Sequence, residues 1–209
     1  MQVQTSLSFV QVTAGAEDTC GLTDGGEVYC WGRNGYGELT SAAGGLGESA
    51  TPVHISLPTP AVSVVAGTIH ACALDASGVA SCWGWNSDGE TGGGQRSSSP
   101  VDAVTVAYDR PFVQLALGYG FSCGLDDLGQ AVCWGSNSDA QLGKSGPSGP
   151  IPTAVSTVLR FVRLSAGASD VCGLTPDHSL YCWGANADGE ITPGGVPGPF
   201  STPTLVPVP

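Results

Sequence analysis

Apolar and polar residues alternate over short stretches of this chain, and glycine or a turn sequence ends each stretch. Residues 9–15, with the sequence Phe-Val-Gln-Val-Thr-Ala-Gly, alternate regularly and predict a β-strand. Further strands are predicted over residues 18–22 and 28–32, on either side of a turn at 24–26. A fourth strand is predicted over residues 51–55, where a proline suits the edge of a sheet because it has no backbone N–H.

The same unit of four strands recurs four times along the 209 residues. Each copy has a Cys, a Leu two residues later, a turn, and a second Cys followed by Trp-Gly, and the first Cys moves by 52, 51 and 49 residues from copy to copy. A period of this length is typical of propellers and solenoids. The other first strands are predicted over residues 61–67, 112–118 and 161–167, and the other outer strands begin near Pro100, Pro152 and Pro203.

Four antiparallel strands in each repeat correspond to one propeller blade. The sequence therefore predicts an all-β fold: a single β-propeller domain over residues 1–209, built from four four-stranded antiparallel blades. The blades are predicted at approximately residues 8–57, 58–107, 108–157 and 158–209. They form either a closed four-bladed ring or an open, partial propeller.

Composition supports this fold class and excludes several partners. The 32 Gly, 15 Pro and 11% charged residues fit many short strands joined by tight turns, and 41% hydrophobic residues are enough for a sizeable core. Six Lys and Arg stand against eighteen Asp and Glu, and the net charge of −12 repels the phosphates of nucleic acid and anionic membranes. No apolar run approaches the roughly 20 residues that span a bilayer, so no transmembrane segment is predicted.

The eight cysteines are predicted to form four disulfides. A hairpin centred near Gly25 sets Cys20 opposite Cys30, and directly opposed residues of antiparallel strands come close enough for a disulfide. The predicted pairs are Cys20–Cys30, Cys72–Cys82, Cys123–Cys133 and Cys172–Cys182. Zinc binding and thiol redox catalysis are disfavoured because the chain has no C-x-x-C motif and its histidines do not follow the cysteines.

Four equally spaced cysteine pairs indicate an oxidising compartment, so the protein is predicted to be extracytoplasmic: periplasmic, secreted or at the cell surface. The first five residues, Met-Gln-Val-Gln-Thr, have neither the basic residues nor the apolar stretch of an export signal. We therefore expect that Met1 is not the natural start of the protein. Residues 2–5 are expected to pair with the fourth blade, to end a truncated blade, or to add to a partner.

The repeated residues resemble those of the regulator of chromosome condensation family. The strings that carry the resemblance are F-V-x-V-x-A-G, C-x-L-x-x-x-G-x-V-x-C-W-G-x-N-x-x-G-x-L and P-x-x-V, and the cysteine-paired version is similar to repeats of exported bacterial proteins. The resemblance implies a β-propeller, usually of seven blades, that acts as a rigid platform for binding macromolecules. The founding member is a nuclear guanine-nucleotide exchange factor that contacts chromatin, a role that the acidic charge and paired cysteines contradict.

If the four blades keep the curvature of a seven-bladed ring, they form an open arc, and the first and last blades each have one sheet face without a neighbour. Large exposed apolar faces normally mark an interface. We therefore expect a partner subunit, further repeats, or closure into a tighter ring.

The aromatic residues fall into two groups. Trp31, Trp83, Trp134 and Trp183 recur at one repeat position and are predicted to pack between blades. Four aromatic residues lie off the pattern and are predicted to contact a partner: Tyr36, Trp85, Tyr119 and Phe121.

Other polar motifs favour structural roles. The acidic turns 86–90, 137–139 and 186–190 contain oxygen ligands that suit calcium, but Asn and Asp are also what tight turns require, and turn chemistry is favoured. His54, His70 and His178 occupy different repeat positions and form no evident triad. No catalytic residue, metal site or cofactor is predicted.

These observations predict a non-enzymatic protein-binding or scaffold subunit of an exported protein or complex. Its partner is expected to be another protein or the subunits of an extracytoplasmic complex, not nucleic acid. Contacts are expected through the loops 40–50, 91–99, 143–151 and 191–202, which vary between copies. Two alternatives remain: a surface adhesin that stacks Trp85 and Tyr36 on a glycan, and a propeller hydrolase or lyase with its site on the propeller face.

Overall fold

A computed structural model of the chain describes residues 6–39, 47–192 and 197–207. These residues form sixteen β-strands and no helix, and none of them belongs to a helix that could cross a bilayer. The expected strand at residues 2–5 lies outside the described residues. The strands are β1 (Phe9–Ala14), β2 (Asp18–Thr23), β3 (Val28–Arg33), β4 (Glu48–Ile55), β5 (Ala61–Ala66), β6 (His70–Asp75), β7 (Ala80–Asn86), β8 (Ser97–Thr105), β9 (Phe112–Leu117), β10 (Phe121–Asp126), β11 (Ala131–Gly135), β12 (Gly149–Ala154), β13 (Arg163–Ala166), β14 (Asp170–Leu174), β15 (Leu180–Gly184) and β16 (Phe200–Leu205).

The strands make four separate sheets of four, each antiparallel and ordered as in the chain. We call these sheets blade 1 (β1–β4), blade 2 (β5–β8), blade 3 (β9–β12) and blade 4 (β13–β16). Tight turns join the second and third strand of each blade, and the turn residues Gly26, Gly78 and Gly129 have φ of 80°, 81° and 73°. Glycine adopts this left-handed conformation at little cost because it has no Cβ.

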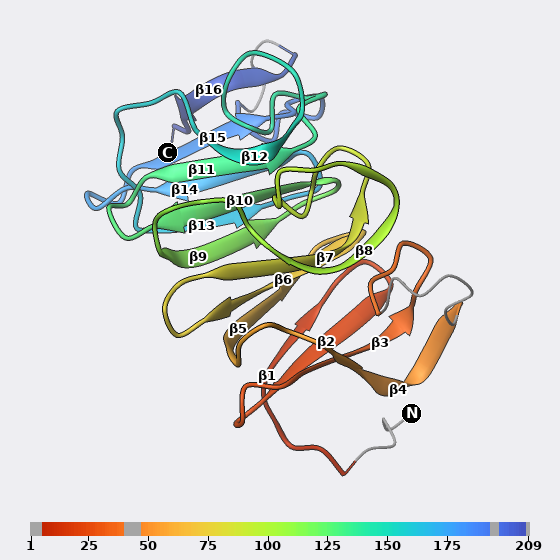
Figure 1. Ribbon diagram of the computed structural model, residues 1–209. Coiled ribbons are helices and arrows are strands. Elements are labelled where there is room, and N and C mark those ends of the chain that lie inside the picture. The colour runs from red at the N-terminus through yellow and green to blue at the C-terminus, as the bar shows by residue number, and fades with distance from the viewer. Residues whose placement is uncertain (1–5, 40–46, 193–196, 208–209) are drawn as a thin grey trace.

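The four blades follow one another along an open arc (Figure 1). Their first strands face one another in sequence, since β5 packs beside β1, β9 beside β5 and β13 beside β9. Blade 1 and blade 4 stand at opposite ends of the arc. The fold is therefore an all-β, open, partial propeller, and the alternative of a closed four-bladed ring is wrong.

The core lies between the blades rather than within them, because each sheet buries its apolar faces against its neighbours. At the junction of blades 1 and 2, Leu22 and Val28 of blade 1 pack against Val64 and Trp83 of blade 2. Equivalent clusters join blade 2 to blade 3 and blade 3 to blade 4. The predicted packing between blades is thus confirmed for Trp83, Trp134 and Trp183, which lie in blades 2, 3 and 4.

All four predicted disulfides are present, and the described residues include no free cysteine. Each pair joins residues that stand directly opposite in the ladder, such as Cys20 in β2 and Cys30 in β3. The disulfides connect the two central strands of every blade. In blades 1 to 3 they lie on the face that the next blade covers, which leaves them buried.

Candidate functional site

One end of the propeller carries the longer loops. The loops after the first and third strands of each blade emerge at this end, because adjacent strands are antiparallel. We call this end the loop face; it includes residues 33–39, 85–91, 118–120, 136–142, 167–169 and 185–191. It is where binding loops on a rigid scaffold are expected.

The loop after each third strand is held by a repeated pair of hydrogen bonds. In blade 1 the amide oxygen of Asn34 accepts from the backbone N–H of Leu39 at 2.9 Å, and a carboxylate oxygen of Glu38 accepts from the N–H of Tyr36 at 2.8 Å. The same arrangement recurs in the other three blades, with the amide oxygen of Gln141 in place of the glutamate carboxylate in blade 3. Burial raises the pKa of Glu38 above its ordinary value.

These bonds favour turn chemistry over calcium for the acidic loops. In blade 2 both Asn86 and Glu90 are buried and use their side-chain oxygens on the backbone of their own loop. Burial likewise raises the pKa of Glu90. Among the described residues no group of three His, Cys, Asp or Glu side chains is arranged to hold a metal ion.

The structure brings three of the four predicted contact aromatics to the loop face. The rings of Tyr36 and Trp85 meet edge to face, with centroids 5.7 Å apart. Trp85 Nε1 donates to Ser87 Oγ at 2.7 Å, and Tyr119 is exposed. The contact role of these three residues remains a prediction.

Phe121 does not lie on this surface, so the predicted contact with a partner is wrong for this residue. It is fully buried at the start of β10 and belongs to the core between blades 3 and 4. The residue stands out from the repeat because the same position is Asp18 in blade 1 and His70 in blade 2. A departure from a repeat can thus arise in the core as well as on a surface.

Trp85 and Tyr119 line one pocket of about 390 Å³, which we call the loop-face pocket. It lies where the loops of blades 2, 3 and 4 meet. Its other lining residues are mainly small, hydroxyl-bearing or acidic: Ile69, Ser87, Asp88, Glu90, Gly120, Ser136, Ser138, Asp139, Gln141 and Ser169.

The loop-face pocket has the chemistry of a site for a cationic group. Asp88 and Asp139 are half-buried at its wall, and no Lys or Arg lines it. Aromatic rings next to carboxylates attract ammonium and guanidinium groups through both charge and the ring quadrupole. The sequence analysis singled out the acidic turns that contain the two aspartates but assigned them to turn chemistry, and it did not predict that they line a pocket together.

A buried His–Ser pair lies behind this pocket. His70 Nε2 is 2.7 Å from Ser122 Oγ, and the serine hydroxyl donates to the carbonyl of Glu90 at 3.0 Å. Both residues are buried, and burial lowers the pKa of His70 to about 4. The pair is therefore closed to substrate, and its serine proton is held by a backbone carbonyl.

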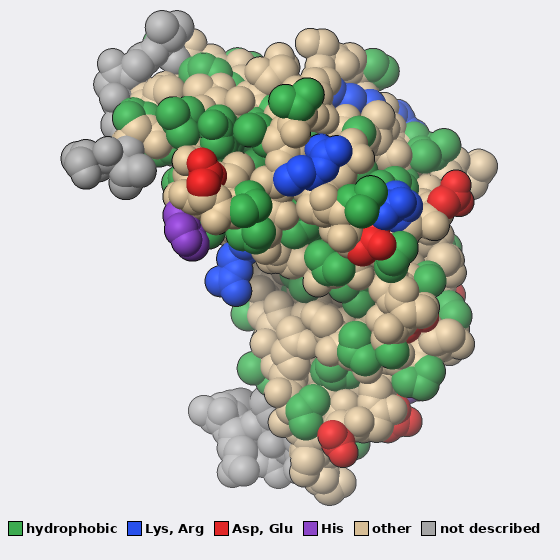
Figure 2. All heavy atoms as spheres, turned by 90° about the vertical axis from the view of Figure 1, so that its left-hand side faces the viewer, with side chains coloured by type: hydrophobic (Ala, Val, Ile, Leu, Met, Phe, Trp, Pro, Cys, Tyr) green, Lys and Arg blue, Asp and Glu red, His purple; other side chains and the backbone are tan. Residues whose placement is uncertain are grey.

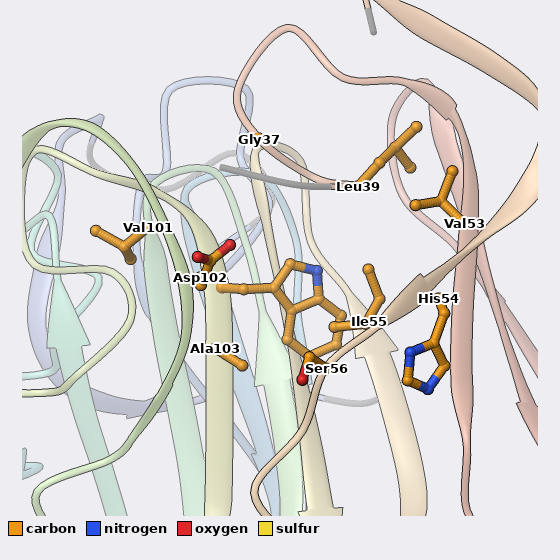
Figure 3. A pocket seen from close by; sticks show the side chains of 10 residues that line it. Gly37, Leu39, Val53, His54, Ile55, Ser56, Val101, Asp102 and Ala103 are labelled. Carbon is orange, nitrogen blue, oxygen red and sulfur yellow. The ribbon is translucent and has the colours of Figure 1, made fainter. Parts of the chain in front are cut away.

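A second pocket, of about 370 Å³, lies between the outer parts of blades 1 and 2 (Figure 3). Leu39, Val53 and Ile55 face Val101 and Ala103 across it. Its wall also contains Trp83 and the polar residues His54, Ser56 and Asp102. This pocket has fewer groups that would orient a ligand than the loop-face pocket.

Charged side chains are sparse on the surface. Figure 2 shows basic and acidic side chains scattered among polar and hydrophobic ones, without an extended basic patch on the face in view. Nucleic acid binds chiefly to clustered Lys and Arg, and the exclusion of a nucleic-acid partner stays a prediction.

The fold and its loop face define a disulfide-linked repeat protein of the β-propeller class, and propellers built from repeats of this kind generally bind proteins or regulate them. Two family models described as "Regulator of chromosome condensation (RCC1) repeat" match the chain, one over residues 9–38, 61–90 and 112–141 and the other over 25–74. Together they cover more than half of its residues. The chain belongs to the RCC1 repeat family.

Individual relatives are longer than this chain. It is 32% identical over 148 residues to the probable E3 ubiquitin-protein ligase HERC6 of Homo sapiens, an alignment that covers 67% of this chain and 14% of that protein. Prp20p from Saccharomyces cerevisiae superposes with a TM-score of 0.84 and 18% identity, over 98% of this chain and 51% of that one. The ectodomain of the receptor kinase CR4 from Physcomitrella patens has a TM-score of 0.59 and 24% identity, over 86% of this chain and 40% of that one.

Proposed function

We propose that this chain is a non-enzymatic protein-binding or scaffold part of an exported protein or complex, and that its loop face binds a basic side chain of a partner protein. The observation that carries the proposal is the loop-face pocket, where Asp88 and Asp139 stand beside the rings of Trp85 and Tyr119. A net charge of −12 would attract a basic partner from a distance.

Two comparisons support parts of the proposal, namely protein binding and an extracellular location. Prp20p, which shares the fold, is described by its binding to Gsp1p and histones. The CR4 match is to an ectodomain, so a propeller of this kind occurs in at least one extracellular region. The four disulfides favour an oxidising compartment and hence export.

The proposal is tested with random peptides displayed on phage and selected on the intact, non-reduced chain. We expect selected peptides to be enriched in Lys or Arg and their binding to weaken as salt increases, because exposed charge pairs are screened. The double variant Asp88→Asn with Asp139→Asn is expected to weaken binding about tenfold, the equivalent of about 1.4 kcal/mol. Trp85→Ala should weaken it as well.

Matched controls separate the pocket from general surface effects. Asp24→Asn removes one exposed charge from a turn at the opposite end of the blade, and Leu128→Ala removes an exposed apolar side chain from another such turn. Neither should change peptide binding. Selected peptides without basic residues, or equal binding by the Asp88/Asp139 double variant, would contradict the proposal.

The glycan alternative is examined with the same variants on a glycan array. Binding of neutral glycans that is lost in Trp85→Ala but retained in the aspartate double variant would favour a sugar-stacking site over a basic side chain.

A further inference from the structure

A glutamine side chain links the first strands of neighbouring blades at the first and the last of the three blade junctions. Between blades 1 and 2, the amide of Gln11 donates to the carbonyl of Val64 at 3.0 Å and accepts from the N–H of the same residue at 3.1 Å. Between blades 3 and 4, Gln114 makes the same two bonds to Leu164 at 2.7 and 2.9 Å. We call this pair of bonds the glutamine clamp. A carboxamide is neutral, so the clamp does not respond to acid.

The middle junction, between blades 2 and 3, has no glutamine clamp. The position of Gln11 and Gln114 is Ser63 in blade 2. The serine side chain is too short to bond both backbone groups of Leu115, the residue of β9 that corresponds to Val64. Among the residues that the structure describes, Ser63 makes no hydrogen bond to blade 3. The first strands β5 and β9 therefore lie side by side without this side-chain link.

The middle junction instead has a side-chain link in its core. His70 of β6 bonds through Nε2 to Ser122 Oγ of β10 at 2.7 Å, and Ser122 donates to the carbonyl of Glu90 at 3.0 Å. Because the hydroxyl hydrogen goes to Glu90, the imidazole carries its own hydrogen on Nε2. Trp134 Nε1 of blade 3 donates to the same carbonyl at 2.8 Å. The two blades thus meet at one carbonyl through a titratable side chain.

This link has no place for a second proton on the imidazole. His70 Nδ1 is buried and has no hydrogen-bond partner among the described residues. Ser122 of β10, Gly84 of β7 and Glu90 of the loop after β7 lie against His70, and the carboxylate of Glu90 accepts from the N–H of Asp88 at 2.9 Å. Burial alone lowers the pKa of His70 to about 4. A proton on Nδ1 would be a buried charge without an acceptor.

The equivalent positions respond differently to acid at the other two junctions. Between blades 3 and 4, the residues that correspond to His70 and Ser122 are Phe121 and Val171, which belong to one apolar cluster and do not titrate. In blade 1 the position of His70 is Asp18, and acid gives this buried carboxyl its favoured neutral form because burial raises its pKa to about 7. Of these three positions, only that of His70 acquires a buried charge in acid.

We propose that the junction of blades 2 and 3 is an acid-opened hinge, at which blades 1 and 2 separate from blades 3 and 4 when His70 takes up a second proton. The loop-face pocket has Asp88 on the blade 2 side of this junction and Asp139 on the blade 3 side. Opening moves these two walls apart, so acid releases a basic partner from the pocket. The release rests on the proposed function of the pocket, whereas the opening does not.

The direction of the pH effect follows from the two states of the junction. In the closed junction His70 is held neutral, and in the open junction water restores its ordinary pKa of 6.5. The closed state therefore loses stability as the pH falls from about 6.5 to about 4, and loses no more from this group below that.

Hydrogen exchange of three indole N–H groups, followed by NMR on the intact, non-reduced chain, measures the opening. Trp83, Trp134 and Trp183 each donate to a carbonyl of the preceding blade, so each reports on one junction. Dividing the Trp134 rate by the other two at the same pH removes the intrinsic effect of pH. We expect this ratio to rise about tenfold or more between pH 7 and pH 4.5. Global unfolding would accelerate all three groups alike.

Three variants use the neighbouring junctions as templates. His70→Phe with Ser122→Val gives the middle junction the apolar pair of the last one and should abolish the rise in the ratio. Ser63→Gln supplies a glutamine clamp and should slow Trp134 exchange at both pH values. Gln114→Ser is the matched control: it removes the clamp of the last junction and should accelerate Trp183 exchange equally at both pH values.

The effect on the pocket is measured with a Lys- or Arg-containing peptide selected by phage display on this chain. Its affinity should fall more between pH 7 and pH 4.5 in the parent than in the His70→Phe/Ser122→Val variant. Loss of charge on the pocket carboxylates affects both proteins alike and cancels in this comparison. Equal losses would overturn acid release, while a lack of any such peptide would contradict the proposed function of the pocket and leave the exchange experiment to decide on the hinge.

Two results would overturn the hinge itself. The first is a Trp134 ratio that stays the same at pH 4.5 in the parent chain. The second is an equal rise in the His70→Phe/Ser122→Val variant, since another group would then be responsible for the opening.

Discussion

At the scale of single residues, one repeat position shows how burial decides ionisation. The residue two before the first cysteine is Asp18 in blade 1, His70 in blade 2, Phe121 in blade 3 and Asp170 in blade 4. Burial, and then the nearby charge of Glu38, raises the pKa of Asp18 to about 7. Burial lowers the pKa of His70 to about 4. In each case the folded protein favours the neutral form.

The raised pKa of Asp18 predicts that the folded state is more stable at mildly acidic pH. Between about pH 7 and its ordinary value of 3.8, Asp18 holds a proton in the folded state that it lacks in the unfolded state. Stability from this group is therefore lost as the pH rises through about 7. The melting temperature should rise when the pH is lowered from 8 to 6.5, and Asp18→Asn should reduce that rise while the exposed Asp24→Asn leaves it unchanged.

Calorimetry over this pH range checks the prediction, and equal pH dependence in Asp18→Asn and the parent would refute it. Below about pH 6.5 the opposite effect of His70 enters, because its depressed pKa makes the folded state lose stability as the unfolded chain takes up a proton. Between about pH 6.5 and 4 these two single-proton effects oppose each other, so the combined contribution of Asp18 and His70 to stability should be nearly constant there and should fall as the pH rises through about 7.

At the scale of elements, the local alternation of residues predicted the strands closely where the blade is regular. The strands predicted over 9–15, 18–22 and 28–32 are found as β1 (Phe9–Ala14), β2 (Asp18–Thr23) and β3 (Val28–Arg33). β4 begins at Glu48 instead of residue 51, because a bulge after Cys30 lets Ser49 pair with Gly32. Pairing partners distant in the sequence set that boundary, and local patterns do not report them.

A second prediction concerns the turn between the second and third strands of a blade. It compares Gly78 of blade 2 with the residue at the same position in blade 4. Gly78 has φ of 81°, and a Cβ on it would lie 2.7 Å from the Cβ of Pro111 and from the carbonyl oxygen of Phe112. Gly78→Ala is therefore expected to lower the free energy of unfolding by about 1–2 kcal/mol or more.

The matched change is His178→Ala, at the same repeat position but with no blade described beyond it. It is expected to change stability by less than about 0.5 kcal/mol, as is usual for exposed positions. Urea unfolding of both variants provides the comparison. Similar losses in both would mean that the approach of the next blade does not make the glycine necessary.

At the scale of the whole molecule, the sequence predicted the number of blades and the disulfides because both repeat at a fixed spacing. The loop-face pocket could not be predicted in the same way, since it joins Trp85 of blade 2, Tyr119 of blade 3 and Ser169 of blade 4, which no local pattern relates. The uncovered end faces were expected from the number of repeats, but the residues on them were not, because Val12 has the same sequence environment as its buried counterparts and is nevertheless 64% exposed. Exposure there depends on whether a neighbouring blade is present.

The disulfides supply the last prediction, because they link stability to the compartment in which the protein is expected to act. Each of the four closes a loop with a sequence separation of 10 residues, and the chain-entropy model assigns such a loop somewhat less than about 3 kcal/mol. Burial protects the first three pairs, whereas Cys172 at the open end of blade 4 is partly exposed. A reducing agent should therefore open the Cys172–Cys182 bond first, and full reduction should lower the melting temperature.

Mass spectrometry after alkylation, with and without denaturant, counts the free thiols at each step, and the melting temperature is followed on the same samples. The chain without reductant is expected to show no free thiol. If the fully reduced chain were as stable as the oxidised one, the disulfides would not be needed for folding. The main physical argument for an extracytoplasmic location would then be lost, while the propeller fold and its loop-face pocket would stand.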